Sequence, residues 1–230
     1  MFDTISGYYH CNYASSPVVL LRHDVENRYE NALQFARIEH RLGLKGTYYF
    51  RFIEDSFNAS MISSIAGMGH EVGYHYDDLC ACKGNCEDAI KRFEYHVKLL
   101  GNIAPVKTIC MEGNPLSKYD NRDLWKKYSY RDFGIETEPY LDIDYDKIAY
   151  FTDTGRRWNG SRVSLRDKVK SSYHFNFRST FDIIENIGKL PDKVMFTFHP
   201  QRWNDNVAAW TKELILQNLK NQVKFFMVSK

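Results

Sequence analysis

Short apolar runs that lead into ionisable side chains recur along this chain, and they constrain its fold more than any other feature. The run VVLL at residues 18–21 leads into Asp24. A predicted strand after Gly69 leads into His75, and another, at residues 193–198, leads into His199. Continuous apolar runs of this length are typical of strands buried on both faces of a parallel sheet. The polar residues then stand where the strands end.

Helical patterns separate these strands. We predict helices over residues 31–42, 61–68, 86–100, 121–128 and 207–223, and a helix that Ser179 caps. Further strands are predicted over residues 47–50, 106–110, 133–136 and 148–151. This alternation predicts an α/β fold with a parallel sheet, either open or closed as a barrel. We expect one domain over residues 1–230, with an irregular insertion at about 155–177.

Three predicted strand ends carry the residues for one active site, because the carboxyl ends of parallel strands meet at one edge. Asp24 and Glu26 are two residues apart, so both face the same way in an extended segment. His75 and His199 can bind a metal or transfer protons near neutral pH. Carboxylates and histidines together can hold a divalent metal that activates water, with a carboxylate as base and a histidine as acid. The set is suited to hydrolysis of an amide or an ester.

Three motifs resemble those of the NodB-type polysaccharide deacetylases: RHDVE at residues 22–26, GHEVGYHY at 69–76 and FTFHPQRW at 196–203. The chain is similar in particular to the divergent branch associated with bacterial O-antigen and surface-polysaccharide gene sets. The segments 113–117, 120–125 and 152–158 add to this resemblance, which covers residues 18–203. It implies a distorted (β/α) barrel and a metal-dependent hydrolase. Such an enzyme removes an N- or O-acyl group, acetyl or formyl, from a sugar in surface-polysaccharide biosynthesis.

The resemblance also implies roles for individual residues. Asp24 would be the catalytic base and His199 the general acid. The ligands of a divalent metal, expected to be zinc, would be Glu26, His75 and Asp78. The substrate-binding positions would be Arg22, Asp153, Arg156, Trp158, Arg202 and Trp203. The expected substrate is an acylated sugar, a sugar nucleotide or a lipid-linked glycan.

The chain departs from the family pattern at the metal site. Leu79 stands where the family has a second histidine, and Glu112 stands where it has an arginine or a histidine. Asp77 or Asp78 could supply the missing ligand, although oxygen ligands favour harder metals.

Two assignments and three functions therefore stay open. Asp24 could be the ligand and Glu26 the base, instead of the reverse. Besides the metal-dependent deacylase, the chain could be a catalytically degenerate module that binds a carbohydrate or a biosynthetic partner. It could also hydrolyse its substrate without metal, through Asp24, Glu26 and His199 alone.

Composition argues against other classes of function. The net charge is +2 and no basic stripe accompanies the aromatic residues, so nucleic-acid binding is not expected. No apolar run approaches the roughly 18 residues of a membrane helix. Residues 1–16 lack a signal-peptide pattern, and we expect a cytoplasmic location. Of the five cysteines, Cys80, Cys82 and Cys86 could hold zinc with one further ligand, or could simply belong to a polar loop.

Overall fold

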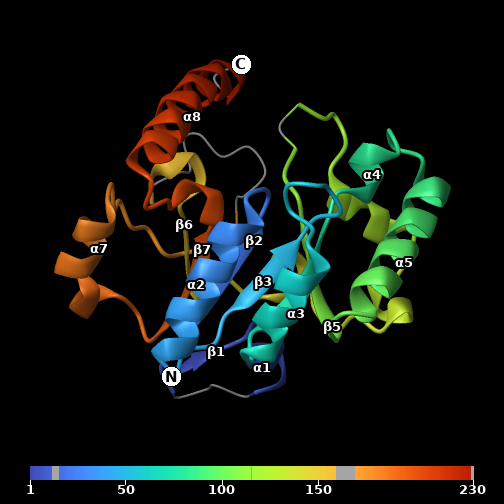
Figure 1. The fold of residues 1–230 in the computed structure, drawn as a ribbon, viewed down its shortest axis with the longest axis horizontal. Helices are drawn as coiled ribbons and strands as arrows, with labels where there is room; N and C mark the ends of the chain where they lie inside the picture. The colour runs from blue at the N-terminus through green and yellow to red at the C-terminus, as the bar shows by residue number, and fades with distance from the viewer. Residues whose placement is uncertain (12–15, 115, 159–168, 229–230) are drawn as a thin grey trace.

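A parallel sheet forms the centre of the computed structural model, which describes residues 1–11, 16–114, 116–158 and 169–228 (Figure 1). Its strands are β1 (Phe2–Asp3), β2 (Val18–Val25), β3 (Thr47–Phe50), β4 (Glu71–Tyr76), β5 (Val106–Met111), β6 (Ala149–Thr152) and β7 (Lys193–Phe198). The order is β5-β4-β3-β2-β7-β6, with β1 paired to β2 beside Val19 and Leu20. All the pairings between these strands are parallel. The predicted parallel α/β fold is confirmed, and β5 and β6 are the edges of the open sheet.

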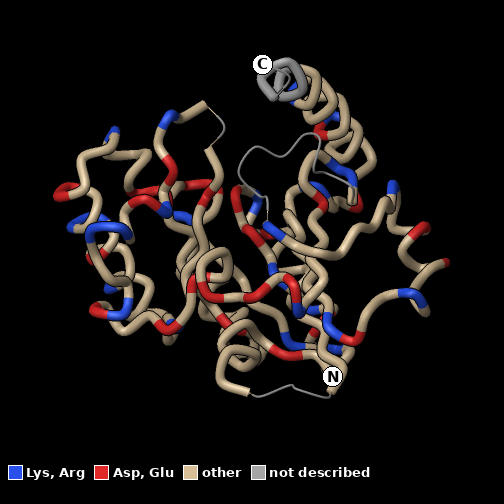
Figure 2. Tube along the Cα trace, turned by 180° about the vertical axis from the view of Figure 1, so that it is seen from behind, with Lys and Arg blue, Asp and Glu red and all other residues tan. Residues whose placement is uncertain are grey.

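Helices connect and cover the strands (Figure 1). The α-helices are α1 (Ile5–His10), α2 (Tyr29–Arg41), α3 (Ala59–Gly67), α4 (Asp78–Ala81), α5 (Cys86–Gly101), α6 (Pro139–Asp142), α7 (Thr180–Glu185) and α8 (Val207–Val228). Short 3₁₀ segments are η1 (Asn121–Lys126), η2 (Tyr130–Phe133), η3 (Thr154–Arg156), η5 (Ile187–Lys189) and η6 (Pro200–Arg202). Among the described residues, none of the helices is long and apolar enough to cross a membrane. Lys and Arg are interspersed with Asp and Glu over much of the trace, whereas residues 132–146 carry six acidic residues and no Lys or Arg (Figure 2).

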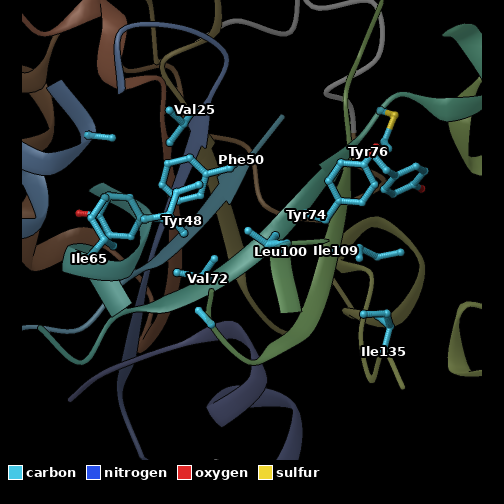
Figure 3. Close-up of a cluster of buried hydrophobic side chains, with 14 of the residues drawn as sticks. Val25, Tyr48, Phe50, Ile65, Val72, Tyr74, Tyr76, Leu100, Ile109 and Ile135 are labelled. Carbon is cyan, nitrogen blue, oxygen red and sulfur yellow. The ribbon is translucent and has the colours of Figure 1, made fainter. Parts of the chain in front are cut away.

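The two faces of the sheet have separate cores, because successive strand residues point to opposite sides. On the outer face, Tyr48, Val72 and Tyr74 pack with residues of α2, α3 and α5 (Figure 3). On the inner face, Leu20 and Tyr49 pack in a second cluster. Polar groups continue this inner face toward the carboxyl ends of the strands, where the candidate site lies.

The structure differs from the predicted elements in two places. Residues 133–136 were predicted as a strand, but η2 ends at Phe133 and Gly134 follows with a φ of 77°. Only an isolated bridge between Thr108 and Thr137 extends the sheet there. The predicted helix over residues 121–128 is the shorter 3₁₀ segment η1.

The N-terminal segment forms two elements that the sequence pattern did not predict. Ile5 of α1 is fully buried, and its backbone N–H donates to the hydroxyl of Thr47 at 3.0 Å. The next backbone N–H, of Ser6, donates to the buried carboxyl of Glu71 at 3.2 Å. These bonds are long-range, so local periodicity could not reveal them. Residues 159–168 of the predicted insertion lie outside the described residues.

Candidate active site

The end of β2 carries a buried ion pair. Arg22 donates two hydrogen bonds to Asp24, from Nε to Oδ1 at 2.8 Å and from Nη2 to Oδ2 at 2.6 Å. Burial by itself raises the pKa of Asp24, but the charges of Arg22 and His75 together outweigh it and hold this pKa below its ordinary value. Asp24 is therefore an ionised carboxylate whose orientation is fixed by Arg22.

His75, in β4, is held by a backbone bond and faces a carboxylate. Its Nδ1 lies 2.9 Å from the carbonyl oxygen of Cys110, and its Nε2 lies 2.9 Å from Oε2 of Glu112. Because a carbonyl oxygen can only accept, Nδ1 carries a proton and Nε2 is the atom directed into the site. Burial alone lowers the pKa of His75. The negative charges of Asp24 and Glu112 outweigh this effect and raise the pKa to about 9.

Glu26 follows β2 and lies close to both His199 and Glu112. Its Oε2 accepts a hydrogen bond from Gln201 at 2.7 Å, and its Oε1 lies 3.6 Å from Nε2 of His199. Burial and the nearby negative charge of Glu112 raise the pKa of Glu26. Its side chain is still 30% exposed, so solvent and a substrate can reach it.

Asp153 fixes the imidazole of His199 from behind. Its Oδ1 lies 2.5 Å from Nδ1 of His199 and accepts from Nη1 of Arg202 at 2.7 Å. Its Oδ2 accepts from the indole of Trp203 at 2.8 Å. Burial raises the pKa of Asp153, but Arg202 and His199 together hold it well below its ordinary value. Burial and Arg202 lower the pKa of His199, whereas Asp153 and Glu26 raise it, and the net direction is upward.

The donor atoms on the β2, β4 and β5 side fit a divalent metal. Asp24, His75 and Cys110 each offer one ligand atom, and these atoms lie within 4.8 Å of one another. Two ligands about 2.1 Å from one metal are at most about 4.2 Å apart, so small movements would complete shared coordination. Glu112 adds a carboxylate beside His75, and its repulsion of Glu26 is the kind of strain that a bound cation relieves.

The structure does not bring Asp78 to this group of ligand atoms. Asp78 is fully buried at the start of α4. Its Oδ1 accepts from Nη1 of Arg92 at 2.6 Å, and the hydroxyl of Tyr74 donates to its Oδ2 at 2.9 Å. Because Tyr74 lies in β4 and Arg92 lies in α5, the Asp78 carboxylate links these two elements and has a structural role.

The residues next to Asp78 are occupied in similar ways. Asp77 accepts hydrogen bonds from Arg51 and Arg92, each at 2.7 Å. Leu79 is buried and packs with Ala89 and Leu124. Position 79, where the resemblance implied a second histidine, is thus part of an apolar contact under α5.

Most of the predicted substrate-binding residues line one cavity. Its volume is about 290 Å³, and its lining includes Asp153, Arg156, Trp158, Arg202 and Trp203. Arg22 is not part of it, since Arg22 is fully buried beside Asp24. The cavity lies next to the carboxylate that holds His199, so these residues adjoin the candidate site.

The predicted cysteine cluster does not form a metal site within the described part of the chain. Cys80 donates to the carbonyl oxygen of Tyr119 at 3.3 Å, and Cys86 lies 3.9 Å from that of Gly84. The group of three potential ligands found among the described residues contains a different cysteine, Cys110.

Comparison with known proteins gives structural matches only. No family model matches the sequence, and no curated protein matches it. Over 91% of this chain, a CE4 family pseudoenzyme from Bacillus anthracis superposes with a TM-score of 0.50 at 13% identity. The chain has a CE4-type fold. It spans 62% of the length of that pseudoenzyme.

Two further structures align less well. The Xyl-CE4 domain of a multidomain xylanase from the hindgut metagenome of Trinervitermes trinervoides has a TM-score of 0.47 at 17% identity, covering 90% of this chain and 85% of that domain. A family 4 carbohydrate esterase from Streptomyces lividans has a TM-score of 0.46 at 17% identity, covering 89% of this chain and 88% of that one.

Several contacts of this candidate site have no clear signal in the sequence. Glu112 was noted only as a departure from a motif, yet it faces Nε2 of His75. Its position directly after β5 was the available signal, because the other site residues also lie at or just after the ends of strands. Gln201 and Cys110 carried no comparable signal, since their roles depend on side-chain direction and on a backbone carbonyl.

Proposed function

We propose that this chain is a metal-dependent hydrolase that removes an acyl group from an acylated sugar in surface-polysaccharide biosynthesis. One observation carries the proposal: Asp24, Glu26, His75 and His199 converge at the carboxyl ends of β2, β4 and β7 of the parallel sheet. The CE4-type fold is shared with a pseudoenzyme, so the site residues rather than the fold carry the case for activity. A sugar carrying an N-acetyl or N-formyl group is the proposed substrate.

The sequence left open which of Asp24 and Glu26 is the metal ligand and which is the base. The charges in the site support Asp24 as the ligand and Glu26 as the base. We assign Asp24, His75 and Cys110 to the metal, with the Glu112 carboxylate beside Nε2 of His75 as a further ligand, since Asp24 has a lowered pKa and the three donor atoms lie within 4.8 Å of one another. We assign proton acceptance to Glu26, whose raised pKa brings it closer to neutrality. When bound, the metal, which we propose to be zinc, supplies Lewis-acid activation of water and of the acyl carbonyl.

The remaining groups complete a hydrolysis. Glu26 accepts a proton from the attacking water, whose oxygen bonds to the acyl carbon. His199, protonated and held at Nδ1 by Asp153, donates a proton from Nε2 to the leaving nitrogen as the carbon–nitrogen bond breaks. Arg22 keeps Asp24 in place throughout. The products are a carboxylic acid and an amino sugar.

Metal content and acyl release test the proposal together. Purified protein, loaded with zinc, cobalt or manganese, is expected to hold about one metal per chain and to release acetate or formate from N-acylated sugar nucleotides or lipid-linked sugars. His75→Ala should lose both the metal and the activity, whereas His40→Ala, an exposed histidine on α2, should keep both. Elemental analysis gives the metal content, and enzymatic acetate or formate assays give the rate.

Two other functions make different predictions in the same experiment. A degenerate sugar-binding module is favoured by the apolar contact of Leu79, and it predicts no acyl release and no stoichiometric metal. Metal that binds in a 1:1 ratio and disappears in His75→Ala would exclude it. Metal-independent hydrolysis predicts activity that survives a chelator. Metal-loaded protein that releases no acid from any of these substrates would refute the deacylase.

A further inference from the structure

A second, smaller cavity adjoins Glu26 on the side of α8. Its volume is about 180 Å³, below the roughly 300–1,000 Å³ of pockets that enclose a drug-sized ligand. The loop after β2, the segment η6 and one face of α8 line it. A cavity of this size is suited to one small group of a larger substrate.

The charged lining of this cavity is mainly cationic. Four cationic side chains, Arg28, Arg202, Lys212 and Lys220, face two carboxylates, Glu26 and Glu213. Both carboxylates already have partners outside this cationic set. Gln201 donates to Glu26 at 2.7 Å, and Glu213 pairs with Arg156. Arg202 is paired in turn with Asp153, and Glu26 keeps its charge because Gln201 is neutral. Arg28, Lys212 and Lys220 therefore outnumber Glu26, the remaining carboxylate, where the cavity meets the proposed active site.

Two of these cations show independent signs of a binding role. Arg202 is buried, and its Nε has no hydrogen-bond partner among the described residues. Arg28 has a φ of 54° and a ψ of 60°, a left-handed conformation that a non-glycine residue adopts at an energetic cost. Such strain is commonly retained at functional positions.

The inner face of α8 explains how the lysines are positioned. Asn221 donates to the carbonyl oxygen of Gly155 at 2.9 Å, and Glu213 holds Arg156. These polar contacts fix α8 above the carboxyl ends of β6 and β7 (Figure 1). Lys212 and Lys220, two turns apart, then both line the cavity.

We infer that this cavity binds the phosphate or diphosphate group of a substrate whose acylated sugar occupies the adjacent site. Guanidinium and ammonium groups together match the several oxygens and multiple charge of a diphosphate better than those of a single carboxylate. The sugar class rests on the proposed function, but the anion site does not. The diphosphate could belong to a nucleotide or to a lipid carrier, and both present the same group to these cations.

Binding of inorganic pyrophosphate to the full-length, chelator-treated protein tests the anion site without any catalysis. Calorimetry should show 1:1 binding that Lys220→Glu weakens at least about tenfold, because the change removes one charge-assisted contact and places a carboxylate beside the anion. Arg28→Gly should also weaken binding, while it keeps the fold, because glycine adopts the left-handed conformation readily. The matched control is Lys91→Glu, which makes the same charge change on an exposed position of α5.

The outcomes separate the two proposals. Absent pyrophosphate binding, or weakening by Lys91→Glu equal to that by Lys220→Glu, would overturn the anion site. Pyrophosphate binding without any acyl release would leave the anion site in place and count against the deacylase. Competition by uridine diphosphate and by a prenyl diphosphate then distinguishes a nucleotide from a lipid as the carrier of the diphosphate. The compound that competes more tightly shows which carrier the surface beside the cavity accepts.

Discussion

Asp153 sets the charge of His199, and this relation can be tested directly. Asp153→Asn keeps the size of the side chain but removes the negative charge beside Nδ1 of His199. Because that charge raises the pKa of His199, the variant should have a lower His199 pKa. The alkaline limb of the pH–rate profile should move to lower pH, and kcat should fall about 100-fold, as is typical when a general acid is impaired.

Two measurements check this prediction. Imidazole nitrogen signals followed by NMR give the pKa of His199 without catalysis, and acyl release gives the pH profile. Asp205→Asn serves as the control, since Asp205 is exposed and belongs to the segment that follows His199. An unchanged His199 titration in Asp153→Asn would show that Asp153 has only a packing role.

Glu138 makes stability depend on pH. It is fully buried, and its Oε1 accepts from the backbone N–H of Met111 at 3.0 Å. Burial raises the pKa of Glu138 to about 7, above the value of about 4.3 in an unfolded chain. The stabilisation from its bound proton is thus complete below about pH 4.3 and is lost as the pH rises through 7.

The variant Glu138→Gln should remove this dependence, because glutamine keeps an acceptor for Met111 and cannot ionise. Between pH 5 and 8.5 the wild type should lose about 3 kcal/mol more of its free energy of unfolding than the variant. Urea titrations at the two pH values measure the difference. Glu136→Gln is the control: contacts with His10 and Lys107 lower the pKa of Glu136 to about 2, so it stays ionised throughout. Parallel pH dependence in wild type and Glu138→Gln would contradict the prediction.

At the scale of elements, Phe93 is a large buried contact between α5 and the outer core. Phe93 is fully buried, and its ring centre lies 4.8 Å from that of Trp125 and 5.7 Å from that of Tyr74. Phe93→Ala should lower the free energy of unfolding by about 3–5 kcal/mol, through lost burial and the cavity it leaves. Tyr95→Ala, on the same helix but 60% exposed, should change it by less than about 0.5 kcal/mol. Similar urea midpoints for the two variants would refute this account of α5.

Elements with a strong local signal were predicted well from the sequence. The strands β3 and β7 begin and end at the predicted residues, and Ser179 forms the predicted cap with Asp182. The elements that were missed depend on distant partners: β1 needs β2, and α1 needs the side chains of Thr47 and Glu71. Periodicity within a short window carries no information about such contacts.

For the whole molecule, parallel topology explains why the site could be anticipated. Strands that run in one direction deliver their final residues to one edge, so Asp24, His75 and His199 had to approach one another once the sheet was parallel. Their detailed partners could not be anticipated in the same way. Rotamers and neighbouring helices decide where the Glu112 side chain points. They also decide that Asp78 forms an ion pair with Arg92.

The same topology separates the two ends of the chain. β1 begins at the amino end of the sheet, whereas α8 extends from the carboxyl end, where the candidate site lies (Figure 1). A polyhistidine tag fused after α8 would therefore bring imidazoles to the face that is proposed to hold a metal, and could donate ligands of its own. A tag fused before β1 would be kept at the opposite face. Purification handles and fluorescent labels accordingly belong at the N-terminus of this protein.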